Sequence, residues 1–113
     1  MRAASLPSLD RTLAALADRE RRLAVDLLRE GPRRAGELAA ELGLAPSAMS
    51  RHLKVLRASG LVEVGENHPE FDARVRIYSL RPEPMAELKV WLEETQRGWE
   101  QQLAAFRAHV ERA

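Results

Sequence analysis

Hydrophobic residues recur at helical spacing through the first part of the chain. Residues 1–17 carry a narrow stripe of the kind that packs against a partner helix, formed by Leu6, Leu9, Leu13 and Leu16. Asp18 is placed to cap a second helix, and Gly31 followed by Pro32 is placed to end it. The pattern predicts two successive helices, the first of which keeps an apolar face for another chain.

Two shorter helices are predicted next, with a tight turn between them. The first covers residues 36–42 and closes at Gly43, and the second opens at Pro46 and ends at Gly60. Residues at i, i+4 and i+7 form the inward face of the second helix; they are Met49, Leu53 and Leu56. Two helices joined by a short turn containing glycine are typical of a helix-turn-helix.

After this helix pair the pattern changes to that of a β-hairpin. Residues 61–64 and 74–80 are β-branched or alternating, and the loop signals Gly65, Asn67 and Pro69 lie between them. A hairpin added to a helix-turn-helix makes a wing. We therefore expect a mostly α fold, a winged helix-turn-helix of five helices with a small β-hairpin wing.

A long terminal helix is predicted from about Pro84 to about Glu111. At about 40 Å it is longer than a domain of this size covers by itself, so its apolar stripe needs a second chain. The candidate dimer-interface residues on it are Leu88, Trp91, Leu92, Thr95, Trp99, Leu103, Phe106 and Val110. An alternative use of this surface is a small apolar effector pocket between the paired terminal helices.

The amino-acid composition excludes several classes of function. The chain has 113 residues, 45% of them hydrophobic, as expected for one globular domain. It has neither an apolar run of bilayer length nor a signal-peptide pattern, so we expect it in the cytoplasm with no membrane partner. The absence of cysteine excludes disulfides, thiolate metal sites and a cysteine nucleophile.

A net charge of only +1 conceals a local basic stretch. Residues 44–61 contain Arg51, Lys54 and Arg57 and no acid, which favours a polyanionic partner. Arg51 is the candidate for base reading, because an arginine can grip guanine O6 and N7 together, while Ser47 suits a phosphate. The candidate DNA-binding residues are Ser47, Ala48, Ser50, Arg51, His52, Lys54 and Arg57, with Arg74 and Arg76 in the hairpin. The alternative is a solvated basic face that binds nothing.

Three segments together resemble the ArsR/SmtB family of winged-helix repressors. They are Glu37-Leu38-Ala39 through Leu42-Gly43-Leu44, then Ser47-Ala48-Met49-Ser50-Arg51-His52-Leu53-Lys54-Val55-Leu56, then Ser59-Gly60-Leu61-Val62. The resemblance covers about residues 10 to 110. It implies a homodimer with the first and last helices at the interface, which binds an inverted repeat of double-stranded DNA at a promoter and usually represses it. The expected organisation is one domain, 1–113: a dimerisation helix (1–17), a DNA-binding core (18–82, wing 61–80) and a second dimerisation helix (83–113).

The sequence departs from this family at its usual metal sites, so we expect no cofactor. Ala39 and Glu41 stand where the arsenic and cadmium sensors have cysteines, and of the terminal-helix zinc ligands only His109 is matched. A second candidate ligand group lies in the wing loop and consists of Glu66, His68, Glu70 and Asp72. A regulator that responds to a metal through this group, or to a small molecule, stays open as an alternative.

Two other function classes are less favoured by the residues. Ser47, Ser50 and His52 lie close in sequence, but neither an acidic orienter nor a glycine-rich loop accompanies them, so we expect no enzymatic activity. An RNA-binding or protein-interaction winged helix is a further alternative. RNA recognition usually stacks bases on aromatic rings. Only two aromatic residues, Phe71 and Tyr78, lie outside the terminal helix, so duplex DNA is the favoured partner.

Overall fold

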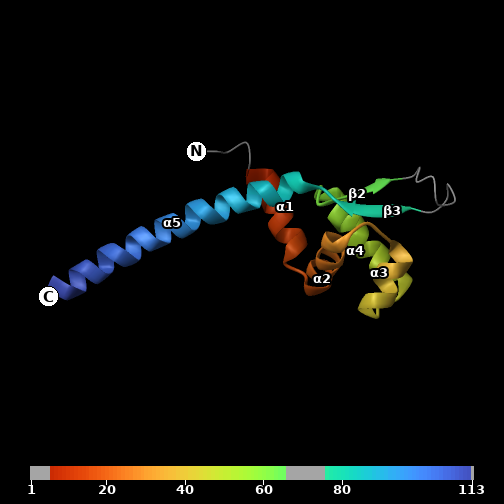
Figure 1. Ribbon diagram of the computed structural model, residues 1–113, viewed down its shortest axis with the longest axis horizontal. Helices are drawn as coiled ribbons and strands as arrows, with labels where there is room; N and C mark the ends of the chain where they lie inside the picture. The colour runs from red at the N-terminus through yellow and green to blue at the C-terminus, as the bar shows by residue number, and fades with distance from the viewer. Residues whose placement is uncertain (1–5, 66–75, 113) are drawn as a thin grey trace.

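The structure is a computed structural model that describes residues 6–65 and 76–112. Within these residues it contains five helices and three short strands (Figure 1). In chain order they are α1 (Leu6–Leu16), α2 (Arg19–Glu30), β1 (Arg33–Arg34), α3 (Ala35–Leu42), α4 (Pro46–Ala58), β2 (Val62–Gly65), β3 (Ile77–Leu80) and α5 (Pro82–Arg112). The expected class, mostly helical with a small antiparallel sheet, is confirmed.

The helix boundaries follow the capping residues in the sequence. At the start of α2, the Asp18 carboxylate accepts a hydrogen bond of 3.0 Å from the backbone N–H of Arg21. At the end of α3, Gly43 has φ of +66°, a left-handed conformation that glycine adopts most easily. Pro46 is the first residue of α4. These three predicted boundaries are confirmed.

The sheet has one strand more than the sequence predicted. β2 and β3 form the expected antiparallel hairpin, with Val62 opposite Leu80. On its other edge β3 pairs with β1, whose Arg33 lies opposite Tyr78. β1 was missed because two successive arginines show neither alternation nor β-branching. The segment between the hairpin strands, with Arg74 and the candidate ligands Glu66, His68, Glu70 and Asp72, lies outside the described residues.

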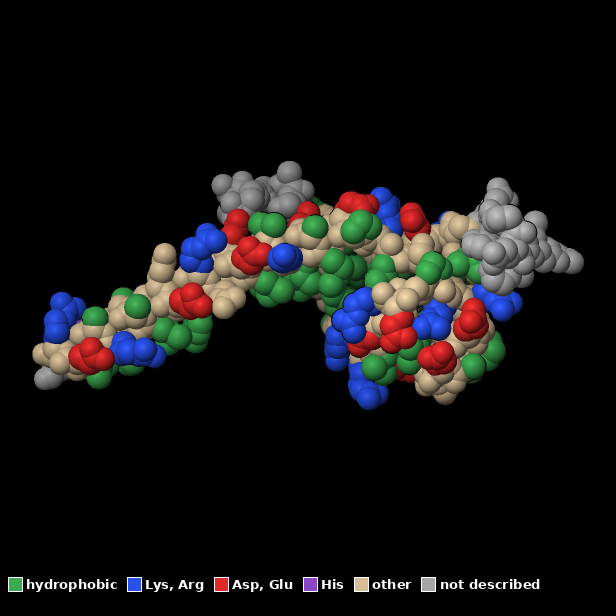
Figure 2. Space-filling view, in the orientation of Figure 1, with side chains coloured by type: hydrophobic (Ala, Val, Ile, Leu, Met, Phe, Trp, Pro, Cys, Tyr) green, Lys and Arg blue, Asp and Glu red, His purple; other side chains and the backbone are tan. Residues whose placement is uncertain are grey.

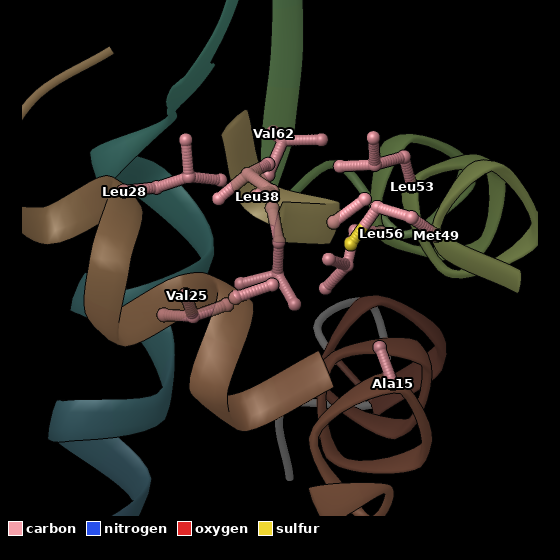
Figure 3. Close-up of a cluster of buried hydrophobic side chains, with 11 residues drawn as sticks. Ala15, Val25, Leu28, Leu38, Met49, Leu53, Leu56 and Val62 are labelled. Atoms are coloured by element: carbon pink, nitrogen blue, oxygen red, sulfur yellow. The ribbon is translucent and has the colours of Figure 1, made fainter. Parts of the chain in front are cut away.

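One hydrophobic core holds the helix pair against α2 and the sheet (Figure 3). The predicted inward face of α4 is confirmed, because Met49, Leu53 and Leu56 are almost completely buried. They meet Leu38 of α3 and Val62 of β2 in a single cluster. Burying side chains of this size is worth about 1.5–3 kcal/mol each, so the core fixes which face of α4 points outward.

The terminal helix α5 leaves this core and extends away from it (Figure 1). It begins at Pro82, two residues before the predicted start, and its first part contacts α1. The radius of gyration is 19.0 Å, against about 13 Å for a compact chain of this length. None of the described helices has both the length and the apolarity needed to cross a bilayer.

Candidate nucleic-acid interface

The outward face of α4 is polar and accessible. Ser47, Ser50, Arg51, Lys54 and Arg57 are all exposed, whereas Ala48 is half-buried. Their exposure follows from the helical period. Because the three apolar residues of α4 that enter the core lie on one side of the helix, the residues between them lie on the outside. The helix therefore presents hydroxyl groups near its start and cations along its length.

The hairpin adds a second wall to this face. A cleft of about 250 Å³ lies between α4 and β3, lined by Ser50, Arg51, Leu53, Lys54, Arg57, Arg76 and Tyr78. Arg76 is exposed just before β3, and Arg74 lies outside the described residues. Tyr78 was not predicted from the sequence, because its place beside α4 depends on the pairing of β3 in the sheet.

Positive charge in this cleft is not neutralised by described acids. Within residues 6–65 and 76–112, neither Arg51, Lys54 nor Arg57 forms an ion pair. Arginines elsewhere are paired, since Arg33 Nη2 lies 3.0 Å from Glu30 Oε1. Unpaired cations that line a cleft are suited to the phosphates of a nucleic acid.

The start of α4 has no side-chain cap. Its N-cap residue is Ala45, whose side chain cannot accept a hydrogen bond from the first-turn amides, and Pro46 has no N–H of its own. The backbone amides of Ser47 and Ala48 therefore lack a capping side chain. Because the N-terminus of a helix carries partial positive charge, this end of α4 also suits an anionic oxygen.

His52 is a predicted DNA-binding residue of α4 whose side chain turns toward the protein. Its side chain is only 15% exposed. Its Nδ1 lies 3.3 Å from Nη1 of Arg21, and its Nε2 lies 3.5 Å from Oε1 of Glu20. The imidazole is thus held between two residues of α2 and is set apart from the outward face.

The same corner holds the only set of candidate metal ligands among the described residues. Asp18, Glu20 and His52 place one ligand atom each within 4.8 Å of one another. A guanidinium already lies among them, since Arg21 Nη1 is 3.8 Å from Asp18 Oδ2. The backbone N–H of Arg21, donated to the carboxylate, lowers the pKa of Asp18. The positive charge of Arg21, which already pairs with Asp18, would oppose the binding of a divalent cation here.

Exposed hydrophobic side chains also lie along α5, among charged ones (Figure 2). We call the outer group of these the α5 stripe, formed by Leu92, Trp99, Leu103, Phe106 and Val110, all exposed. Trp91 of α5 and Leu13 of α1 are exposed apolar residues too, and Thr95 is exposed.

The other predicted interface residues differ in their surroundings. Leu9 and Leu88 are buried within the single chain, and Leu16 packs against its core, so these three offer little surface to a partner. The side chain of Leu6 lies outside the described residues. His109 is exposed near the end of α5.

The chain is similar to known bacterial regulatory proteins. Residues 18–64 match the family described as bacterial regulatory protein, arsR family. The HTH-type transcriptional regulator Rv2034 of Mycobacterium tuberculosis is 39% identical over 99 residues, which cover 88% of this chain and 85% of that protein.

Two solved structures illustrate the structural similarity. An ArsR-like transcriptional regulator from Rhodococcus sp. RHA1 has a TM-score of 0.74 and 27% identity, covering 92% of this chain and 93% of that one. The homodimeric winged helix-turn-helix DNA-binding domain Mb0332 of Mycobacterium bovis has a TM-score of 0.65 and 27% identity, covering 85% of this chain and 84% of that one.

Proposed function

Because the chain belongs to the arsR family of bacterial regulatory proteins, we propose that it is a homodimer that reads an inverted repeat of double-stranded DNA with α4. As a family member it is a transcriptional regulator with a winged helix-turn-helix domain and not an enzyme. The observation that carries the proposal is the basic cleft between α4 and β3, where Arg51, Lys54 and Arg57 form no ion pair with any acid of residues 6–65 and 76–112.

In this proposal each wall of the cleft has its own contact with DNA. Arg51 enters the major groove and reads a guanine, because its guanidinium can donate to O6 and N7 at once. Lys54, Arg57 and Arg76 bind phosphates on either side, and Tyr78 offers a hydroxyl to the same backbone. The uncapped amides at the start of α4 bind a further phosphate.

Dimerisation supplies the symmetry of the DNA site. The exposed α5 stripe needs a cover, and a second copy provides one; the similar Mb0332 domain is homodimeric. A two-fold dimer presents two α4 helices and therefore reads two half-sites in inverted orientation. We further propose that it acts as a repressor, because a dimer bound across a promoter blocks polymerase by occupancy alone.

The proposal is tested by measuring binding to the promoter of the protein's own gene at several salt concentrations. We expect Arg51→Ala to weaken binding by about ten- to a hundredfold and to relax the preference at one base position of each half-site. Arg29→Ala is the matched control: its exposed guanidinium lies on α2 and pairs with Asp26 at 3.9 Å. It removes the same charge outside the cleft.

Two results would contradict this assignment. One is equal affinity and equal base preference for Arg51→Ala and Arg29→Ala, which would leave Arg51 with no role in base reading. The other is wild-type affinity that does not fall with rising salt, since phosphate binding by several cations releases counterions and is strongly salt-dependent.

A further inference from the structure

Arg21 lies where three helices meet. Its Nε donates a hydrogen bond of 2.7 Å to the carbonyl oxygen of Ala15, near the C-terminal end of α1. Its Nη1 faces His52 of α4 at 3.3 Å and Asp18 at 3.8 Å, and the side chain is only 18% exposed. One guanidinium therefore connects the end of α1, the start of α2 and the middle of α4.

The chemistry of arginine fixes the direction of the contact with His52. A guanidinium stays protonated and has only donors, so the His52 Nδ1 atom that faces it must accept. The imidazole tautomer that fits this contact carries its proton on Nε2. That nitrogen is the one that faces the Glu20 carboxylate at 3.5 Å. Residues of α2 thus hold both edges of the ring.

This contact gives α4 a constraint that its apolar face lacks. Met49, Leu53 and Leu56 hold the helix by hydrophobic packing, which is not directional. A hydrogen bond to His52 is directional, and His52 is adjacent to Arg51 in the sequence. A base contact needs donor and acceptor within about 2.7–3.2 Å, so a small rotation of α4 would take Arg51 out of reach.

We propose that Arg21 is a positioning residue for DNA binding: the core fixes which face of α4 points outward, and through His52 Arg21 fixes the exact rotation of α4 and so the position of Arg51. By its bond to Ala15 it also ties that orientation to the end of α1. The inference rests on the proposed role of α4 in reading DNA. Arg21 itself does not need to contact the nucleic acid.

The neighbouring arginine provides a matched control. Arg22 Nη1 donates to the carbonyl oxygen of Leu16 at 2.8 Å, so it also caps α1, but no contact with α4 is found for it among the described residues. Arg21→Ala and Arg22→Ala therefore remove the same charge and a short hydrogen bond to the end of α1 each, and Arg21→Ala also removes a longer one of 3.5 Å to the carbonyl oxygen of Ala14. We expect Arg21→Ala to weaken DNA binding about tenfold more than Arg22→Ala does. Equal losses in the two variants would overturn the proposal.

Two substitutions of His52 test the contact from the other side. His52→Asn keeps an acceptor near the position of Nδ1, whereas His52→Ala removes it. We expect His52→Asn to retain most of the affinity and His52→Ala to lose about as much as Arg21→Ala. The double variant of Arg21→Ala and His52→Ala should be no weaker than either single one. If instead the two losses multiply, Arg21 does not act through His52.

Amide hydrogen exchange separates this proposal from the proposed function. We expect the amides of α4 to exchange faster in Arg21→Ala than in the wild type. In Arg22→Ala we expect their exchange rates to equal those of the wild type. If the wild type binds no DNA, the proposed function fails, while exchange still tests the link between Arg21 and α4. Unchanged exchange in Arg21→Ala would overturn that link. If Arg21→Ala does not fold, the comparison of His52→Asn with His52→Ala decides in its place.

Discussion

Asp18 is the residue through which acid should weaken the fold. Its carboxylate accepts the backbone N–H of Arg21, and this hydrogen bond is the main cause that lowers the pKa of Asp18 in the folded chain. Since the unfolded chain binds the proton more readily, ionised Asp18 stabilises the fold above its ordinary pKa of about 3.9. That contribution is lost as the pH falls through about 4 and below.

A substitution that keeps the cap but removes the charge tests this pH dependence. Asparagine caps helices about as well as aspartate, so Asp18→Asn retains the hydrogen bond from Arg21 without titrating. Urea unfolding at pH 7, 5 and 3 should show the wild type losing its stability advantage over Asp18→Asn as the pH falls. Asp26→Asn, at an exposed position paired with Arg29, is the control. An advantage that stays constant from pH 7 to 3 would contradict the assignment.

At the scale of residues, the sequence predicts the features that depend on residues close by in the chain. The helical period identified the inward face of α4, and the Asp18 cap followed from its place directly before the amphipathic segment 19–30. The contact between Arg21 and His52 spans 31 positions, and no local pattern indicates it. Tyr78 was missed for the same reason, since only the sheet brings it to the cleft.

At the scale of elements, the turn between α3 and α4 depends on Gly43. Its φ of +66° lies in the left-handed region, which costs a residue with a Cβ about 1–2 kcal/mol. We expect Gly43→Ala to lower the free energy of unfolding by about 1 kcal/mol. Gly36 lies within α3, and a Cβ at this position would meet open space, so Gly36→Ala should raise stability by about 0.5–1 kcal/mol.

Denaturant unfolding of the two variants measures both effects under the same conditions. Both variants replace glycine by alanine within one helix-turn segment. If stability falls in Gly43→Ala and rises in Gly36→Ala, the difference in backbone conformation between the two positions is the cause. If both variants shifted stability in the same direction, the left-handed turn at Gly43 would not explain the result.

The start of α5 and the strand β1 are two features that sequence patterns do not predict correctly. Proline predicted the start of α5, but Pro82 and Pro84 both satisfy the rule for the first helical turn, and the helix begins at the earlier one. β1 consists of two arginines that become a strand only because β3 offers an unpaired edge. Its pairing is tertiary in origin, so propensity could not reveal it.

At the scale of the whole molecule, the shape argues for a second chain. The long axis measures 69 Å, most of it α5, and the α5 stripe is exposed over its outer part (Figure 2). Both tryptophans of the chain, Trp91 and Trp99, lie on this helix and are 38% and 62% exposed. Tryptophan fluorescence therefore reports the environment of α5 and of no other element.

We expect the wild type to sediment as a dimer and its tryptophan emission to shift to longer wavelength on dilution, as the stripe returns to water. Phe106→Glu should weaken dimerisation by about a hundredfold or more, since each protomer loses a large apolar contact. Ala108→Glu is the control, because position 108 lies about half a turn away from Phe106 and Val110 on the helix. It adds the same charge on the opposite face and should leave the dimer intact.

The outcome also decides how the DNA is read. If dilution leaves the emission unchanged and Phe106→Glu sediments like the wild type, the stripe does not join two copies, and an inverted repeat has no structural basis. If Phe106→Glu is monomeric, its affinity for a full site should fall to about that for a half-site, because the second α4 is no longer tethered to the first. Retained affinity for a half-site would then separate loss of symmetry from loss of the DNA-reading surface.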